Sequence, residues 1–206
     1  MKVKICGLRT EEAVLAAEDA GADFLGFIFY EKSHRHVLPE EVRGLTKHVQ
    51  RAKTVGVFVD APLDEVNAAA DFCSLDFVQL HGHESAAYAR AVCRPVIKAF
   101  RWGDDFSVEK ANEYPAEIIL LDSFSKDAVG GTGQRFRWRE AAEETARLEK
   151  PLLVAGGIAS GNVREAEEVF RPYGVDVSGS LEIEKRKSVE RIREFMAVVQ
   201  KRRIPE

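Results

Sequence analysis

Long apolar runs and a cysteine framework are both missing from this chain of 206 residues. No run approaches the ~18 apolar residues of a membrane helix, so we expect no membrane partner. The N-terminus carries no apolar segment of the kind that marks a signal peptide. The three cysteines, Cys6, Cys73 and Cys93, are an odd number without close spacing. They therefore predict neither a disulfide framework nor a zinc site, and they favour a cytoplasmic location.

The chain also lacks a large excess of either charge. Its net charge is only −4, and both signs are mixed along the chain. We find no basic stripe with interleaved aromatic residues, so we expect no nucleic-acid partner. The basic residues at 185–187 and 201–203 are interpreted as a solvated helix face and tail. Hydrophobic residues make up 45% of the chain, which indicates a globular protein, and its length predicts a single domain over residues 1–206.

One pattern repeats along the chain, in which a short apolar run is followed by a turn and then by an amphipathic stretch. The runs lie at residues 3–6, 24–29, 54–59, 77–80, 96–100, 118–121, 152–155 and 175–178. They are short and bounded by Gly, Pro, Asp or Ser, which favours strands over buried helices. Eight strand–helix units predict a (β/α)8 TIM barrel with few decorations.

An open, doubly wound sheet is the main alternative to the barrel. It usually carries a glycine-rich loop after its first strand, but this chain has Cys6-Gly7-Leu8-Arg9 there, which is no dinucleotide fingerprint. Helix signals fill the stretches between the strands. Thr10 predicts a helix start, Pro39 predicts a first helical turn, and residues 188–199 predict the last helix.

Several polar residues fall on strand positions that alternation turns toward the barrel interior. In the first strand Lys4 and Cys6 share the inward face, and in the eighth strand Asp176 lies between two valines. Charges inside a barrel destabilise it unless they are paired. We therefore expect Lys4 and Lys98 to pair with Asp176 inside the barrel. The alternative is a register shift of one residue, which turns these charges outward.

Four polar residues mark the C-terminal ends of predicted strands, where barrel enzymes build their active sites. They are Cys6, His81, Asp122 and Ser178. A thiolate at Cys6 can act as a nucleophile or a general base, although an inert buried thiol is the common fate of free cysteine. A carboxylic acid at Asp122 could complete an acid–base pair, with a turn or cap aspartate as the alternative.

Glycine-rich strand ends predict a phosphate site. Gly156 and Gly157 follow the seventh strand and lead to a helix near Asn162, while Gly179 and Ser180 follow the eighth strand. Backbone N–H groups at such turns and helix starts bind anions. A polar loop at residues 123–135 contains further glycines and is expected to permit closure over a ligand.

The histidine pairs His34/His36 and His81/His83 invite a metal interpretation. Neither pair comes with a carboxylate at metal-ligand spacing on a helix, so we expect no metal. No cofactor motif is found either, so we expect no cofactor.

Taken in order, these motifs resemble those of the phosphoribosylanthranilate isomerase family over essentially the whole chain. The matching pieces are Lys4-Ile5-Cys6-Gly7, Lys32-Ser33-His34-Arg35, Val78-Gln79-Leu80-His81-Gly82, Leu121-Asp122, Gly130-Gly131-Thr132-Gly133, Ala155-Gly156-Gly157-Ile158 and Val175-Asp176-Val177-Ser178. Each piece alone is weak, but the ordered set is specific. One departure follows the eighth strand, where the family pattern Ser-Ser-Gly reads Ser-Gly-Ser here.

The resemblance implies an Amadori rearrangement of N-(5-phosphoribosyl)anthranilate in tryptophan biosynthesis, catalysed without a cofactor. It implies that Asp122 is the general acid that opens the ribose ring and that Cys6 is the general base that removes the C2′ proton. It further assigns substrate contacts and phosphate contacts. The substrate contacts are Arg35 at the anthranilate part, Gln79, His81 and Asp176, and the phosphate contacts are Gly133, Gly156, Gly157, Gly179 and Ser180.

Other functions remain open at this point. One is a related phosphosugar barrel, such as an epimerase, which needs metal ligands, or an indole-glycerol-phosphate synthase, which needs a catalytic lysine. Another is a phosphate-ligand binder without catalysis, which the presence of both Cys6 and Asp122 disfavours. An isomerase that also serves histidine synthesis is disfavoured by the thiol at Cys6, where we expect an aspartate. The partner is expected to be a small phosphorylated substrate, and the protein a monomer or a homodimer.

Overall fold

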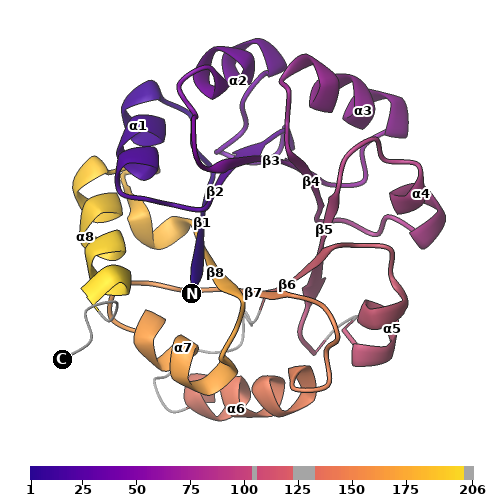
Figure 1. Ribbon diagram of the computed structural model, residues 1–206, viewed down its shortest axis with the longest axis vertical. Coiled ribbons are helices and arrows are strands. Elements are labelled where there is room, and N and C mark those ends of the chain that lie inside the picture. Colours follow the sequence, from indigo (N-terminus) through magenta and orange to yellow (C-terminus); the bar gives the residue numbers. More distant parts are fainter. Residues whose placement is uncertain (104–105, 123–132, 202–206) are drawn as a thin grey trace.

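Parallel strands alternating with helices make up the computed structural model, which describes residues 1–103, 106–122 and 133–201, with the side chains of residues 133–137 left aside. Within these residues, strands β1 to β8 close into one barrel, and helices surround it (Figure 1). The strands are β1 (Lys2–Cys6), β2 (Phe24–Ile28), β3 (Lys53–Phe58), β4 (Phe77–Leu80), β5 (Val96–Arg101), β6 (Ile118–Asp122), β7 (Leu152–Ala155) and β8 (Gly174–Val177).

The helices follow the strands in order. They are α1 (Glu11–Asp19), α2 (Pro39–Thr46), α3 (Leu63–Phe72), α4 (Ala86–Arg90), α5 (Val108–Glu113), α6 (Gly133–Thr145), α7 (Val163–Phe170) and α8 (Val189–Gln200). After β8 the chain adds a 3-10 turn, η1 (Gly179–Leu181), and a small antiparallel hairpin of β9 (Glu182–Ile183) and β10 (Arg186–Lys187).

The predicted (β/α)8 barrel is confirmed, and each predicted strand overlaps the observed one to within one or two residues at its ends. The predicted helix starts at Thr10 and Pro39 are also confirmed. Thr10 caps α1 by accepting a hydrogen bond from the N–H of Ala13 at 3.4 Å, and Pro39 begins α2. That the chain forms a single domain stays a prediction.

Alternation along the strands produces two apolar layers. Inside the barrel, one buried cluster gathers side chains from several strands, namely Phe24, Val55, Ile97, Ala99, Ile118, Leu120, Leu153 and Ala155. The opposite faces of the same strands pack against the helices in a larger second cluster. Strands buried on both faces explain why the sequence shows apolar runs and not a polar–apolar alternation.

The predicted pairing of Lys4 with Asp176 is confirmed. Lys4 is fully buried, and its Nζ lies 2.8 Å from Oδ1 of Asp176. The two residues are register partners in the pairing of β1 with β8, where the first strand meets the last and closes the barrel. The closure of the fold therefore places this ion pair inside.

The predicted pairing of Lys98 with Asp176 is wrong. Ile97 and Ala99 occupy the interior face of β5, so Lys98 points to the helix side of the sheet. There its Nζ lies 2.8 Å from Oε2 of Glu84, and both side chains are buried. Both faces of β5 are apolar around this lysine, so the sequence did not show which face is inside.

Glu18 of α1 has a structural role at the end of the barrel opposite the strand C-termini. Its buried carboxylate accepts backbone hydrogen bonds from Gln50, Arg51 and Ala52 at 3.1, 2.7 and 3.2 Å. Burial alone disfavours the charged form, but these bonds outweigh it and lower the pKa of Glu18. The carboxylate thereby fixes the connection into β3.

No helix among residues 1–103, 106–122 and 133–201 is long and apolar enough to cross a bilayer.

Replacing Glu18 by glutamine should lower the free energy of unfolding at neutral pH by about 1–3 kcal/mol, because buried N–H groups lose a charged acceptor. The pKa of Glu18 is lowered in the folded state, so this stabilisation is present above the unfolded-state pKa and is lost as the pH falls. Urea unfolding at several pH values measures it. Asp19→Asn, on the exposed neighbouring residue, is the control, and an equal effect of both variants contradicts the assignment.

Candidate active site

A cavity of about 490 Å³ opens at the C-terminal ends of the strands. Its walls come from β1, β2, β3, β4, β6, β7 and β8 and from the loops that follow them. The lining residues are Cys6, Ile28, Arg35, Val57, Gln79, His81, Asp122, Ala155, Gly156, Gly157, Ile158, Asp176, Ser178, Gly179 and Ser180. Ten of the eleven residues predicted for the site line this cavity.

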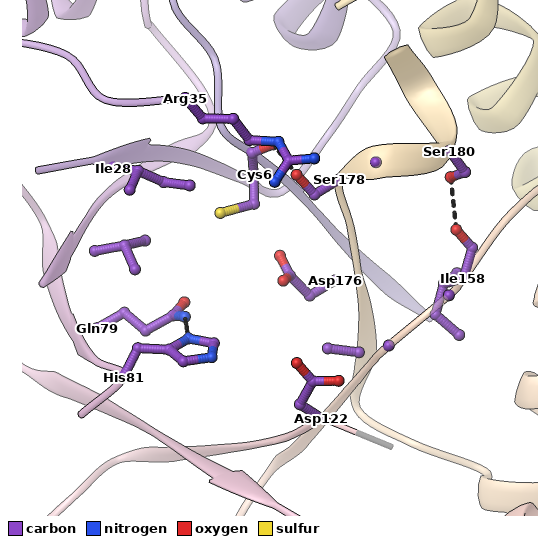
Figure 2. A pocket seen from close by; sticks show the side chains of 15 residues that line it. Cys6, Ile28, Arg35, Gln79, His81, Asp122, Ile158, Asp176, Ser178 and Ser180 are labelled. Carbon is purple, nitrogen blue, oxygen red and sulfur yellow. Dashed lines mark hydrogen bonds between the residues drawn. The ribbon is translucent and has the colours of Figure 1, made fainter. Parts of the chain in front are cut away.

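Cys6 and Asp122 lie on opposite sides of the cavity, with Asp176 between them (Figure 2). Cys6 is the last residue of β1 and Asp122 is the last residue of β6. The thiol and the carboxylate therefore face one shared cavity from the ends of two strands. A bound molecule between them can lose a proton on one side and gain one on the other.

The thiol of Cys6 is almost fully buried, and this burial raises its pKa. The positive charge of Lys4 acts in the opposite direction, whereas the carboxylate of Asp176 raises the pKa further. Lys4 itself stays charged, because the attraction of Asp176 and Cys6 outweighs the desolvation of its ammonium group and raises its pKa.

Gln79 and His81 form the wall below Cys6 in Figure 2 and are joined by a hydrogen bond of 2.9 Å between Nε2 of Gln79 and Nδ1 of His81. Desolvation lowers the pKa of His81, although Asp122 and Asp176 oppose the shift, so the ring is neutral at neutral pH. The buried Oε1 of Gln79 has no hydrogen-bond partner within the described part of the chain. It is therefore an acceptor available to a ligand.

The loops after β7 and β8 form the opposite end of the cavity. Gly156 and Gly157 have φ angles of 88° and 71°, which favour glycine over other residues. Asn162 donates to the carbonyl of Gly157 at 2.9 Å and so braces this turn. The two loops are joined where the Ser180 hydroxyl donates to the carbonyl of Ile158 at 2.6 Å (Figure 2).

The surroundings of Gly133, another predicted site residue, lie outside what the structure describes. Gly133 begins α6 on the chain that follows β6. The polar loop at residues 123–135, whose glycines would permit closure, falls largely on residues 123–132, which lie outside the described residues.

Arg35 enters the cavity from the loop after β2 and is held by Glu182 of the β9–β10 hairpin. Its Nε and Nη2 donate to the two oxygens of Glu182 at 2.5 and 2.9 Å. Lys187 adds a third bond to the same carboxylate at 2.7 Å, and His34 lies 3.3 Å away. Burial opposes ionisation of Glu182, but Arg35 and Lys187 lower its pKa to about 2.

Sequence reasoning missed the functional position of Glu182 and Lys187. Lys187 belongs to the segment 185–187 that was interpreted as a solvated helix face, which is wrong for this residue, because its side chain is 4% exposed. Its Nζ also donates to the carbonyl of Ser178 at 3.1 Å. The hairpin has only two residues per strand, so no sequence periodicity reveals it. The only signal for a role in the site was that the segment closely follows the end of the eighth strand.

The histidines outside the cavity wall make ordinary contacts. His34 lies against Glu182, and His83 Nδ1 lies 3.1 Å from Asp60 Oδ2. In the part of the chain that the structure describes, no three His, Cys, Asp or Glu side chains gather as ligands for a metal ion.

The family model described as N-(5'phosphoribosyl)anthranilate (PRA) isomerase matches residues 3–198 of the chain. A curated relative from Geobacter sulfurreducens named N-(5'-phosphoribosyl)anthranilate isomerase is 46% identical over 198 residues, which cover 95% of this chain and 97% of the relative. A relative of the same name from Geotalea uraniireducens is 48% identical over 182 residues, covering 88% of this chain and 89% of the relative.

Solved structures agree with these relatives. Phosphoribosyl anthranilate isomerase from Thermotoga maritima is 34% identical with a TM-score of 0.86, and the match covers 97% of this chain and 98% of that one. A phosphoribosyl anthranilate isomerase in complex with reduced 1-(O-carboxyphenylamino)-1-deoxyribulose 5-phosphate is 32% identical with a TM-score of 0.84 and the same coverage. Thiamine phosphate pyrophosphorylase from Pyrococcus furiosus, at 18% identity, shares the fold alone.

Glu182→Gln should destabilise the protein by about 2–3 kcal/mol at neutral pH, the scale set by a pKa lowered from 4.5 to about 2. A lowered folded-state pKa stabilises the protein above pH 4.5, and this contribution is lost as the pH falls toward 2. The difference in unfolding free energy between wild type and variant should therefore shrink in acid.

Urea unfolding from pH 7 downward measures this difference. Glu184→Gln, an exposed change in the same hairpin, is the control. A wild-type advantage over Glu182→Gln that stays constant down to pH 3 would contradict the charged network.

Proposed function

Since the chain belongs to the N-(5'-phosphoribosyl)anthranilate isomerase family, we propose that its cavity performs this isomerisation with Cys6 as general base and Asp122 as general acid. The reaction is a step of tryptophan biosynthesis, and its substrate is a small phosphorylated molecule. The single observation that carries the assignment is the placement of one thiol and one carboxylate on opposite sides of the same cavity (Figure 2).

The phosphate end is assigned to the loops after β7 and β8. Gly156 and Gly157 bring the backbone of one loop to the cavity, and Gly179 and Ser180 bring the start of η1. In barrels of this kind these two loops are the usual phosphate site, where backbone N–H groups meet the anion. We also propose Gly133, at the start of α6, as a phosphate contact, and only the resemblance to the family supports this assignment.

The anthranilate end is assigned to Arg35, which lies above Cys6 and beside Ser178 in Figure 2. Glu182 binds Nε and Nη2 of this guanidinium, which leaves Nη1 for the substrate carboxylate. The planar group can also stack on the anthranilate ring. Because Glu182 holds the arginine in place before the substrate binds, less side-chain freedom is lost on binding.

The chemistry proceeds in two proton transfers between these ends. Asp122 gives its proton to the ribose ring oxygen as the bond from that oxygen to C1′ breaks, and the anthranilate nitrogen forms the Schiff base. Cys6, as thiolate, then takes the proton from C2′, and the electron pair moves to form an enolamine. Tautomerisation of the enolamine to the ketone gives 1-(2-carboxyphenylamino)-1-deoxyribulose 5-phosphate.

The remaining polar groups of the wall serve binding. Asp176 uses one oxygen for Lys4 and has a second oxygen on the cavity side for a substrate hydroxyl. Gln79 offers its unpartnered Oε1 as an acceptor, and His81 a neutral ring nitrogen.

A cytoplasmic location fits three free cysteines, of which Cys6 must stay reduced to act as a base. One structural relative, from Thermotoga maritima, is described as a dimeric isomerase. For this chain a monomer or a homodimer stays a prediction.

Cys6→Ser and Asp122→Asn should each lower kcat/KM by about 10²-fold or more, because each removes one of the two proton transfers. The decay of the fluorescence of freshly made phosphoribosylanthranilate measures turnover. Cys93→Ser and Asp19→Asn, which change exposed residues far from the cavity, are matched controls and should retain wild-type rates. Activity that survives Cys6→Ser places the base elsewhere, and a wild type without turnover contradicts the isomerase function.

A further inference from the structure

The buried ammonium group of Lys4 lies directly below the thiol of Cys6. The two residues are separated by one position on β1, so both side chains point into the barrel, Cys6 at the cavity and Lys4 one layer deeper. Lys4 is fully shielded from solvent. Its Nζ is bound to Asp176 at 2.8 Å, and its positive charge acts to lower the pKa of the Cys6 thiol.

Gly26 on the neighbouring strand β2 lies beside both side chains. It is the register partner of Cys6, and a Cβ placed on it would lie 3.0 Å from Sγ of Cys6 and 3.1 Å from Nζ of Lys4. Both distances are tighter than normal packing allows. The φ angle of Gly26 is not positive, so its backbone does not require glycine. Space therefore explains the glycine at this position, because the ammonium group and the thiol lie where a side chain of residue 26 would be.

We propose that Lys4 is a positioning residue that supplies the positive charge against which the Cys6 thiolate forms, and that Gly26 reserves the space in which the two groups lie near each other. The proposal rests on the role of Cys6 as general base. A cation close to a thiol favours its deprotonated form, and the effect is strong where water is excluded. Asp176 competes for the same ammonium, so it weakens the effect while keeping Lys4 charged.

Several charged groups around Cys6 together determine how readily its thiolate forms. Lys4 on its own strand and Lys187 of β10 favour the thiolate, and Asp176 of β8 disfavours it. Arg35 reaches over Cys6 from the loop after β2, and His81 and Asp122 face it across the cavity (Figure 2).

Lys4 differs from the other cations near Cys6. Lys187 and Arg35 share the single carboxylate of Glu182, which offsets one of their two charges, and Lys187 lowers the pKa of Cys6 less than Lys4 does. Lys4 has an acidic partner too, but its ammonium group and the thiol lie against the same face of Gly26. It is therefore the cation whose loss should change the reactivity of Cys6 most.

The test is the rate at which iodoacetamide alkylates Cys6, read by mass spectrometry of the peptide that contains it. The thiolate is the reactive form, so this rate reports the thiolate fraction whether or not the enzyme turns over. Cys93→Ser is the background, because Cys93 is exposed. Rates are measured from about pH 6 to pH 9.

Two substitutions should shift the rate in opposite directions. Lys4→Met should slow alkylation at about pH 8 by roughly 10-fold and move the pH profile up by about one unit, because the thiolate loses its counter-charge. Asp176→Asn should accelerate alkylation and move the profile down, because the competing carboxylate is gone. If the substitutions only made Cys6 more accessible, iodoacetamide would alkylate it faster in both variants. That outcome overturns the proposal.

Lys2→Met is the matched control, because Lys2 lies on the same strand and forms its own ion pair with Asp23 at 2.7 Å, at the far end from Cys6. It should leave the alkylation rate unchanged. Gly26→Ala fills the space itself and should slow alkylation as Lys4→Met does, which gives a second measurement if Lys4→Met folds poorly. An unchanged rate in Gly26→Ala also overturns the proposal.

Activity and alkylation measurements together distinguish a failure of this proposal from a failure of the proposed function. If Cys6→Ser remains active, the role of Cys6 as base is wrong, whatever the alkylation rates are. If Cys6→Ser is inactive but Lys4→Met alkylates at the wild-type rate, the base is correct and the role of Lys4 is wrong.

Discussion

The ion pair of Lys4 with Asp176 connects the first strand of the barrel to the last, and the organisation of the site depends on it. These residues are register partners where β1 meets β8, so the pair forms only when the barrel closes in this register. Breaking such a buried pair by removing one partner typically destabilises a protein by about 3–5 kcal/mol. The same pair places a positive charge below Cys6, so one interaction links the closure of the fold to the electrostatics of the cavity.

Above this pair, the proposed assignment gives the site two ends of different construction. The phosphate end is made of backbone, because the turns at Gly156 and Gly157 and the start of η1 approach the cavity without bulky side chains. The anthranilate end is made of side chains, in which Glu182 fixes Arg35 through two hydrogen bonds. In the proposed assignment, a substrate with a phosphate at one end and a carboxylate at the other is held between Cys6 and Asp122.

The sequence predicted the strands and most of the cavity because both depend on local patterns. Apolar runs marked the strands, and polar residues at their ends, such as Cys6 and Asp122, marked the site. Lys98 was placed on the wrong face because β5 is apolar on both sides, so alternation carried no information. The Glu182 network was missed because the two-residue strands of the hairpin have no periodicity, and its contact with Arg35 spans 147 positions.

A crystal structure of the protein with reduced 1-(2-carboxyphenylamino)-1-deoxyribulose 5-phosphate tests the assignment of the two ends and of the acid–base pair most directly. We expect the phosphate at residues 156–157 and 179–180 and the carboxylate at Arg35. The carbon that loses its proton should face Sγ of Cys6, and the oxygen that left the ribose ring should face Asp122. A phosphate bound at Arg35, or a reacting carbon turned away from Cys6, would contradict the assignment.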